Sequence, residues 1–131
     1  MSRAAHALDV RRLSGSLGAE VRGLALAQAG LAQRLMIDAS HANSRKDPMN
    51  QPAVCADVGA QVAAGDSRIF GLMVESHIVA GRQDLVPGKE LTYGQSITDG
   101  CIGWDDSVAV LEGLAAAVRE RRRVLAMTEP S

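Results

Sequence analysis

Aromatic residues are almost absent from this chain of 131 residues, which has one Trp, one Tyr and one Phe, or 2% of the total. The length suits one ordinary domain that can bury a core. Because large rings are so few, Ala, Val, Leu and Met must supply most of the packing among the 47% of residues that are hydrophobic.

The net charge is also small, at −1, and the pI is near 6.3. That balance argues against a nucleic-acid-binding or membrane-surface protein. Two cysteines, Cys55 and Cys101, are too few for a disulfide framework and indicate reduced thiols. No apolar run approaches a membrane span, no signal-peptide pattern opens the chain, and no glycine-rich phosphate-binding motif occurs. We therefore expect a cytoplasmic protein.

Residues 1–33 differ in composition from the rest, being rich in Ala, Gly and Leu and lacking Lys, Pro and Cys. Their pattern fits either short strands or a helix, because Leu24, Ala27 and Leu31 also share a helical face. The stretch Leu17–Leu24 faintly resembles the start of taurine-dioxygenase-like proteins, without any of that family's iron ligands. We expect an N-terminal segment unrelated to the remainder of the chain.

From Leu35 onward the pattern predicts parallel βα units. The apolar run Leu35–Ala39 is typical of a strand buried on both faces. A polar loop reaches Gln51, and Pro52 fits the first turn of a helix that Gly65 can end. The apolar stripe of that helix is formed by Val54, Cys55, Val58 and Val62.

A second unit comes next, in the same order. Residues 69–74 form another apolar run, and a long loop is expected from Ser76 to about Gly103. A last helix then starts with Asp105, Asp106 or Ser107 as its cap. Its predicted apolar stripe consists of Val108, Leu111, Leu114, Ala115 and Val118. Strands alternating with helices indicate an α/β fold.

Three polar residues come after these apolar runs. His41 and Glu75 lie just past the two predicted strands, and Asp99 lies late in the long loop. Functional groups of parallel βα folds gather at the carboxyl ends of strands, and an imidazole with two carboxylates suits a divalent ion. The residue types alone favour a plainer interpretation, in which the three side chains make capping, solvated or helix-terminal contacts.

Other polar residues favour plain structural interpretations as well. His77 fits a local hydrogen bond better than a supporting contact to a metal ligand, and Cys101 fits a packed turn better than a ligand. Arg45, Lys46 and Arg82 could meet an anionic substrate, although their spacing does not require it. A basic cluster is expected to stay solvated at a helix C-terminus, where it complements the helix dipole; its members are Arg119, Arg121, Arg122 and Arg123.

Longer motifs carry a more specific resemblance. Residues 35–123 resemble the C-terminal part of the class I 3-deoxy-D-arabino-heptulosonate 7-phosphate (DAHP) synthases. The motifs that carry it are Met36-Ile37-Asp38-Ala39-Ser40-His41-Ala42-Asn43-Ser44, Val54-Cys55-Ala56-Asp57-Val58, Met73-Val74-Glu75-Ser76-His77 and Tyr93-Gly94-Gln95-Ser96-Ile97-Thr98-Asp99-Gly100-Cys101-Ile102-Gly103-Trp104.

The resemblance implies a TIM barrel that condenses phosphoenolpyruvate with erythrose 4-phosphate and water and releases phosphate, the first step of the shikimate pathway. It also implies a divalent metal, one of Mn, Fe, Co or Zn, held by a cysteine, a histidine, a glutamate and an aspartate. The last three fall on His41, Glu75 and Asp99. The family's cysteine lies upstream and matches neither Cys55 nor Cys101, and the upstream basic phosphate-binding residues have no counterpart either.

The expected fold is therefore the last two βα units of a (β/α)8 barrel, an incomplete barrel spanning residues 34–126, with a tail at 127–131. A whole barrel takes about 250 residues, so this part has open edges. We expect a gene fragment, a fusion or a truncated reading frame. The alternative to a DAHP synthase is a non-catalytic chain, inactive alone, that forms a homo-oligomer or completes a barrel with another chain.

Overall fold

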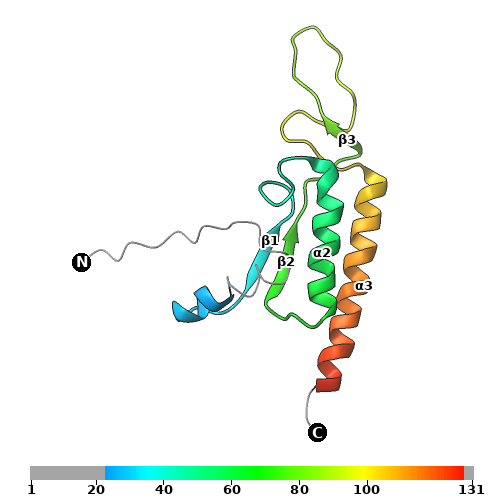
Figure 1. Cartoon of the computed structure of the whole chain (residues 1–131). Coiled ribbons are helices and arrows are strands. Elements are labelled where there is room, and N and C mark those ends of the chain that lie inside the picture. Colours follow the sequence, from blue (N-terminus) through cyan, green and yellow to red (C-terminus); the bar gives the residue numbers. More distant parts are fainter. Residues whose placement is uncertain (1–22, 129–131) are drawn as a thin grey trace, which may run out of the picture.

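The computed structural model describes residues 23–128, and its first part is a strand–helix–strand unit (Figure 1). Strand β1 (Leu35–Asp38) leads through the short 3-10 helix η1 (Pro48–Asn50) into α2 (Gln51–Ala63), and β2 (Ile69–Met73) comes next. β1 and β2 pair in parallel, as the sequence predicted. Pro52 lies in the first turn of α2, and Gly65 lies just past its end with a positive φ of 104° that favours glycine.

The core lies between this sheet and the helices. Leu35 and Ile69 from the strands pack with Val58 and Val62 of α2 and with Ala117 of α3 (Trp104–Thr128). α2 and α3 run side by side over one face of the β1–β2 sheet (Figure 1). Residues 23–28 are helical, and Leu26 packs against the edge of this core.

The opposite face of the sheet is open, which contradicts the prediction that β1 is buried on both faces. Met36 is 61% exposed and Phe70 is 66% exposed. The apolar run predicted the strand correctly, but only one face meets a helical layer in the part of the chain that the structure describes. Residues that would be covered in a closed sheet therefore face solvent.

The predicted loop from Ser76 to Gly103 is wrong in part, because it contains two short strands. β3 (Val79–Arg82) and β4 (Gln95–Ser96) pair with each other, and isolated bridges join Ser76 to Ile102 and Gly81 to Cys101. The segment between β3 and β4 extends away from the helices at the top of Figure 1. These pairings fold the region after Glu75 back toward the end of β2.

The last helix differs from its prediction in its start and in its packed face. α3 begins at Trp104, so Asp105 and Asp106 lie inside its first turn instead of ahead of it. Val108 and Leu111 of the predicted stripe are exposed, at 37% and 66%. Val118 of the stripe packs against the core and Leu114 lies against Gly59 of α2, as predicted. The buried residue of the packed face is Ala117, which the predicted stripe did not include.

The predicted solvated arginine cluster is wrong for one of its members. Arg119, Arg122 and Arg123 are exposed as expected, but Arg121 is half-buried. α3 continues to Thr128, so these arginines are not in its last turn. Arg121 donates hydrogen bonds to the carbonyls of Asp66 and Ile69, at 3.0 and 2.8 Å, and so fastens the segment between α2 and β2 to α3. Arg123 pairs with Glu120 on the same helix.

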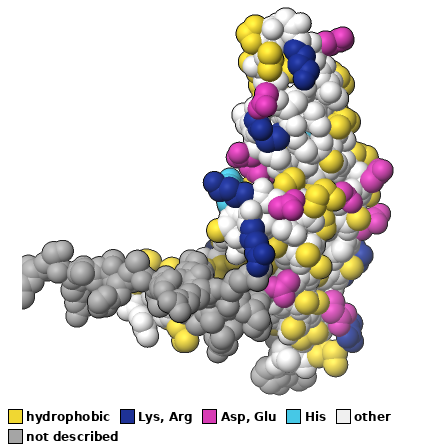
Figure 2. Space-filling model, turned by 45° about the horizontal axis from the view of Figure 1, so that its top comes forward, with side chains coloured by type: hydrophobic (Ala, Val, Ile, Leu, Met, Phe, Trp, Pro, Cys, Tyr) yellow, Lys and Arg dark blue, Asp and Glu magenta, His cyan; other side chains and the backbone are white. Residues whose placement is uncertain are grey.

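The surface mixes charges of both signs. Lys and Arg side chains are interspersed with Asp and Glu over the face seen in Figure 2, with apolar side chains between them. Within residues 23–128, no helix combines the length and the apolar character that crossing a membrane requires. The faint resemblance at Leu17–Leu24 falls mostly outside the described residues, and the domain boundaries at 33 and 126 stay predictions.

Candidate metal centre

His41 stands just past β1, in a loop that hydrogen-bonds to itself. The Ser44 side chain is completely buried and donates to the carbonyls of Ser40 and His41. The Lys46 amide also donates to the His41 carbonyl, at 2.9 Å. Arg45 and Lys46 both have positive φ angles, 56° and 60°, which non-glycine residues seldom adopt. These hydrogen bonds and the tight turn at Arg45 and Lys46 hold the backbone of His41 in place.

Asp38, the last residue of β1, orients the His41 ring. Its Oδ2 lies 2.7 Å from His41 Nδ1, while its Oδ1 accepts hydrogen bonds from the amide and hydroxyl of Ser40 at 2.8 and 2.6 Å. Nδ1–H donates a hydrogen bond to this carboxylate, so in the neutral ring Nε2 carries the lone pair and faces away from Asp38. This carboxylate–histidine arrangement is the usual support of a metal-binding histidine.

Glu75 stands two residues past β2, and its backbone is held on two sides. The Gln51 side chain of α2 accepts from the Glu75 amide at 2.9 Å and donates to the Glu75 carbonyl at 3.0 Å. The Ile102 amide donates to the same carbonyl at 3.0 Å. Glu75 is thus fixed between the start of α2 and the chain that leads into α3.

Asp99 comes from the returning segment after β4. Arg82 Nε donates to the carbonyl of Thr98 at 2.8 Å, and the Ser96 hydroxyl accepts from the Thr98 amide at 3.1 Å. Gly100 lies against the ring of Pro48, where an added Cβ would come within 3.0 Å of Pro48 Cγ. Close packing against η1 on one side and hydrogen bonding to β3 on the other set the position of Asp99.

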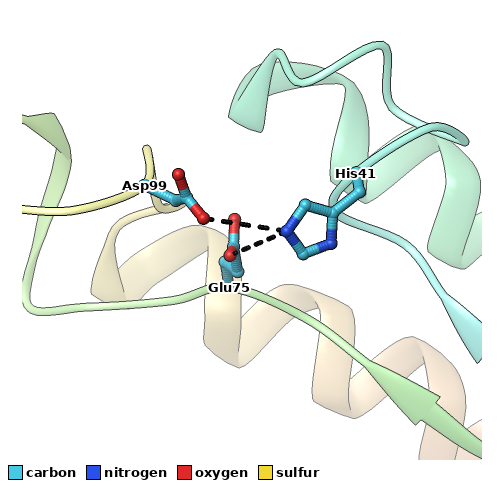
Figure 3. Close-up of side chains that lie close together, drawn as sticks. All are labelled: His41, Glu75 and Asp99. Atoms are coloured by element: carbon cyan, nitrogen blue, oxygen red, sulfur yellow. Dashed lines mark ion pairs between the residues drawn. The ribbon is translucent and has the colours of Figure 1, made fainter.

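The three side chains predicted as ligands meet at one point (Figure 3). His41 Nε2 lies 3.6 Å from Glu75 Oε1 and 3.7 Å from Asp99 Oδ2. One ligand atom from each residue lies within 4.8 Å of the other two. The three side chains therefore lie together in one cluster, in which that of Asp99 is 69% exposed.

Negative charge predominates around His41, because Asp38, Glu75 and Asp99 all lie close to its ring. The hydrogen bond from His41 to Asp38, the charge of Asp38 and the nearby Glu75 and Asp99 raise the pKa of His41. Desolvation first, and then the charge of Asp99, raise the pKa of Glu75, whose side chain is only 23% exposed. Burial disfavours the ionised form of Asp38, but hydrogen bonds from Ser40 and His41 outweigh it and keep the pKa of Asp38 well below its usual range. Two carboxylates and an imidazole lone pair thus face one another, an arrangement that a cation stabilises.

The donor set and its spacing fit a divalent ion. At 3.6 Å from Glu75 Oε1 and 3.7 Å from Asp99 Oδ2, His41 Nε2 is too far from either carboxylate for a hydrogen bond. Two donors that share one ion at about 2.1 Å lie roughly 3.0–3.5 Å apart, so small side-chain rotations would bring all three into range. Imidazole nitrogen and carboxylate oxygen suit Mn²⁺, Fe²⁺, Co²⁺ and Zn²⁺ alike.

The other predicted residues take plain structural roles. His77 Nδ1 accepts from the Ile78 amide at 2.8 Å, the local hydrogen bond that was expected. Cys101 is buried next to Asp99 but does not join the cluster, and Cys55 is buried in α2. Arg82 pairs with Asp84 at 2.6 Å.

Sequence reasoning missed two supporting residues, Asp38 and Gln51. Asp38 could have been suspected from its position three residues before a candidate histidine ligand. Gln51 lies beside Pro52 at a helix start, a context in which polar residues are ordinary, and only its complete burial marks it. Both residues act on ligands at the carboxyl ends of strands.

Fold and site together define an α/β protein with a candidate divalent-metal centre where two parallel strands end. A profile described as the DAHP synthetase I family matches residues 16–112, about three quarters of the chain. The chain belongs to this family. The matched range begins at residue 16, within the segment 1–33 that differs in composition from the rest.

Individual relatives agree. Phospho-2-dehydro-3-deoxyheptonate aldolase of Haemophilus influenzae is 56% identical over 96 residues, which are 73% of this chain and 26% of the relative. The Phe-sensitive aldolase of Escherichia coli K12 is 56% identical over 97 residues, 74% of this chain and 28% of the relative. A solved structure of the Francisella tularensis SCHU S4 aldolase has a TM-score of 0.76 and 42% identity, covering 81% of this chain and 30% of that one. The chain thus spans little more than a quarter of the length of these relatives.

Proposed function

We propose that this chain carries the metal-binding part of a DAHP synthase, the enzyme that joins phosphoenolpyruvate to erythrose 4-phosphate. Family membership and 56% identity to two phospho-2-dehydro-3-deoxyheptonate aldolases support the assignment. The observation that carries it is the meeting of His41 Nε2, Glu75 and Asp99, with His41 Nδ1 already held by Asp38. These are the positions on which the family's histidine, glutamate and aspartate ligands fall.

The proposed architecture is the last two βα units of a TIM barrel, β1 with α2 and β2 with α3. The parallel pairing of β1 with β2 and the position of both helices on one face support it. In such a barrel the opposite face of each strand turns inward and is filled by side chains. The exposure of Met36 agrees with that placement, as does the similarity to part of a much longer solved chain.

His41, Glu75 and Asp99 would hold the ion in this proposal, and an upstream cysteine would be the fourth ligand by family resemblance. A bound divalent ion would act as a Lewis acid toward the aldehyde of the four-carbon sugar or toward a water molecule. Asp38 keeps the His41 lone pair on Nε2, where it can ligate. Gln51 and Ile102 keep Glu75 beside it.

An alternative arises from the short match to each relative. The chain supplies three ligands, and it spans 26% and 28% of the Haemophilus influenzae and Escherichia coli aldolases. Under the alternative, it binds the ion but has no turnover until another chain completes the barrel. Metal binding and turnover are therefore the quantities that separate the two proposals.

The test measures both quantities on the purified chain. Mn²⁺ binding is followed by calorimetry, and phosphate release is followed after addition of phosphoenolpyruvate and erythrose 4-phosphate. We expect His41→Ala to abolish Mn²⁺ binding and His77→Ala, which removes the other described histidine, to leave it unchanged. Phosphate release that depends on His41 supports the enzyme, and Mn²⁺ binding without release supports the alternative. Equal Mn²⁺ binding by both variants would refute the metal centre.

A further inference from the structure

Gln51 is an unusual residue for the first position of a helix, because its side chain is completely buried. The amide group of this side chain is fully used. Its Oε1 accepts from the Glu75 amide at 2.9 Å, and its Nε2 donates to the Glu75 carbonyl at 3.0 Å. The Gln51 side chain thus satisfies both the amide and the carbonyl of Glu75, which lies two residues past the end of β2.

The position of this contact matters because the β1–β2 ladder has already ended. The last ladder pair joins Asp38 to Met73, and the Ala39 amide donates to the Met73 carbonyl at 2.9 Å. Two residues later, Glu75 has no partner on β1. Gln51 presents a donor and an acceptor as a neighbouring strand would, so it replaces the missing strand partner.

We propose that Gln51 is a positioning residue for the metal centre, acting through the backbone of Glu75. This inference rests on the proposed role of His41, Glu75 and Asp99 as metal ligands. The Glu75 carboxylate reaches the cluster from a backbone that Gln51 holds from the α2 side and Ile102 holds from the other side. Without the Gln51 side chain, the Glu75 amide loses its acceptor and the Glu75 carbonyl keeps only the Ile102 amide as a donor. The backbone of Glu75 must then shift to recover the lost hydrogen bonds.

The chain offers a matched pair of variants on one helix. Gln51→Met keeps the shape of the side chain and loses both hydrogen bonds. Gln61→Met makes the same change at the other end of α2, where the Gln61 side chain bonds only to Asp57, four residues earlier. Gln51→Asn is a milder change, because it keeps the amide group and its charge but shortens its reach by one methylene.

The experiment measures Mn²⁺ affinity by calorimetry, the electron paramagnetic resonance spectrum of bound Mn²⁺, and the thermal midpoint of the metal-free chain. Supporting residues of a metal site typically contribute about 10–100-fold in affinity. We expect a loss in that range for Gln51→Met, a smaller loss for Gln51→Asn, a changed Mn²⁺ spectrum in both, and an unchanged affinity and spectrum for Gln61→Met. A purely structural role would lower the thermal midpoint while leaving the affinity and spectrum of the folded chain unaltered.

Glu75→Gln separates this inference from the proposed function. If Glu75→Gln binds Mn²⁺ as tightly as the parent chain does, the metal centre itself is refuted. If Glu75→Gln loses Mn²⁺ while folded Gln51→Met and Gln51→Asn retain parental affinity and spectrum, only the positioning role of Gln51 is overturned. Should Gln51→Met fail to fold, the comparison of Gln51→Asn with Gln61→Met still decides the matter.

Discussion

Replacing Asp38 by Asn should weaken metal binding by moving a proton on His41. Asp38 accepts four hydrogen bonds, two from Ser40 and two from His41, one of them from the ring Nδ1 and the other from the backbone amide. An Asn side chain has one acceptor oxygen and one NH2 donor, so it cannot replace both carboxylate oxygens. The orientation that keeps both Ser40 bonds turns the NH2 group toward His41 Nδ1.

The substitution therefore changes the protonation of the other ring nitrogen of His41, Nε2. When Nδ1 accepts a hydrogen bond, the neutral ring carries its proton on Nε2, the atom that lies 3.6 and 3.7 Å from Glu75 and Asp99. A protonated Nε2 has no lone pair for a metal. Loss of such a supporting carboxylate typically costs about 10–100-fold in metal affinity, and we expect Asp38→Asn to fall in that range.

Calorimetric titration with Mn²⁺ measures the affinity, and nitrogen-15 NMR of the imidazole reports which ring nitrogen carries the proton. Asp57→Asn is the matched control, because it removes the same charge from an exposed position on α2. Equal Mn²⁺ affinity in the two variants, or a proton that stays on Nδ1 in Asp38→Asn, would contradict the reasoning.

Two further predictions concern stability. Asp66 accepts three hydrogen bonds from Arg68, and its side chain is 13% exposed, so Asp66→Asn should lower the free energy of unfolding by about 1–3 kcal/mol in urea titrations at pH 7. The side-chain hydrogen bond from Arg68 lowers the pKa of Asp66 below 3.8 in the folded chain. The stability that Asp66 contributes is therefore complete well above pH 4 and is lost as pH falls through the folded pKa. The variant should differ less from the parent chain at pH 3 than at pH 7, and an equal difference at the two pH values would contradict this prediction. Phe70→Thr on the open face of β2 should reduce binding of the dye ANS while changing the free energy of unfolding by less than about 0.5 kcal/mol. Its control, Val58→Ala in the core, should lower the free energy of unfolding by about 1–3 kcal/mol. A large loss of stability in Phe70→Thr would mean that this face of the sheet is covered.

The sequence predicted those elements whose signals are local. The runs that begin at Leu35 and Ile69 are short and apolar, as strands require. Within a helix, Pro52 is tolerated only in the first turn, and Gly65 tolerates the positive φ just past the end of α2. β3 and β4 gave no such signal. Val79–Arg82 is half polar and Gln95–Ser96 is wholly polar, and contacts distant in sequence pair them. Periodicity could not recognise either strand.

The packed face of α3 was misplaced in part, for a related reason. Apolar residues occur all around this helix, so periodicity admits a stripe through Val108 and Leu111 as readily as one through Val110 and Ala117, and Leu114 and Val118 fit both. Gly59 on α2 decides between them, because the absence of a side chain lets Ala117 approach closely. That information lies on another element and enters only when the two helices are brought together.

For the site, residue types and strand ends suggested His41, Glu75 and Asp99, but the residues alone favoured separate contacts, and the resemblance to DAHP synthases was needed to join them. The physical reason is the route of Asp99. It reaches the cluster through the pairing of β3 with β4 and through Arg82, Thr98 and Pro48, none of which a βα pattern reveals. The supporting residues were missed because their importance lies in the groups they contact.

Those contacts also imply that metal binding and turnover can be separated in this chain. Asp38 fixes His41, Gln51 fixes Glu75, and the Arg82–Thr98 hydrogen bond holds the segment of Asp99, so the three positions are set within residues 23–128. Enclosure of the site is a different matter, since the side chains of Asp99 and His41 are 69% and 44% exposed. A metal ion needs only the three donors to be retained, whereas the two phosphorylated substrates of the proposed function need walls and cations around them. Under that proposal, an ion that binds without turnover is therefore the expected outcome, until another chain covers the open face beside Met36 and Phe70.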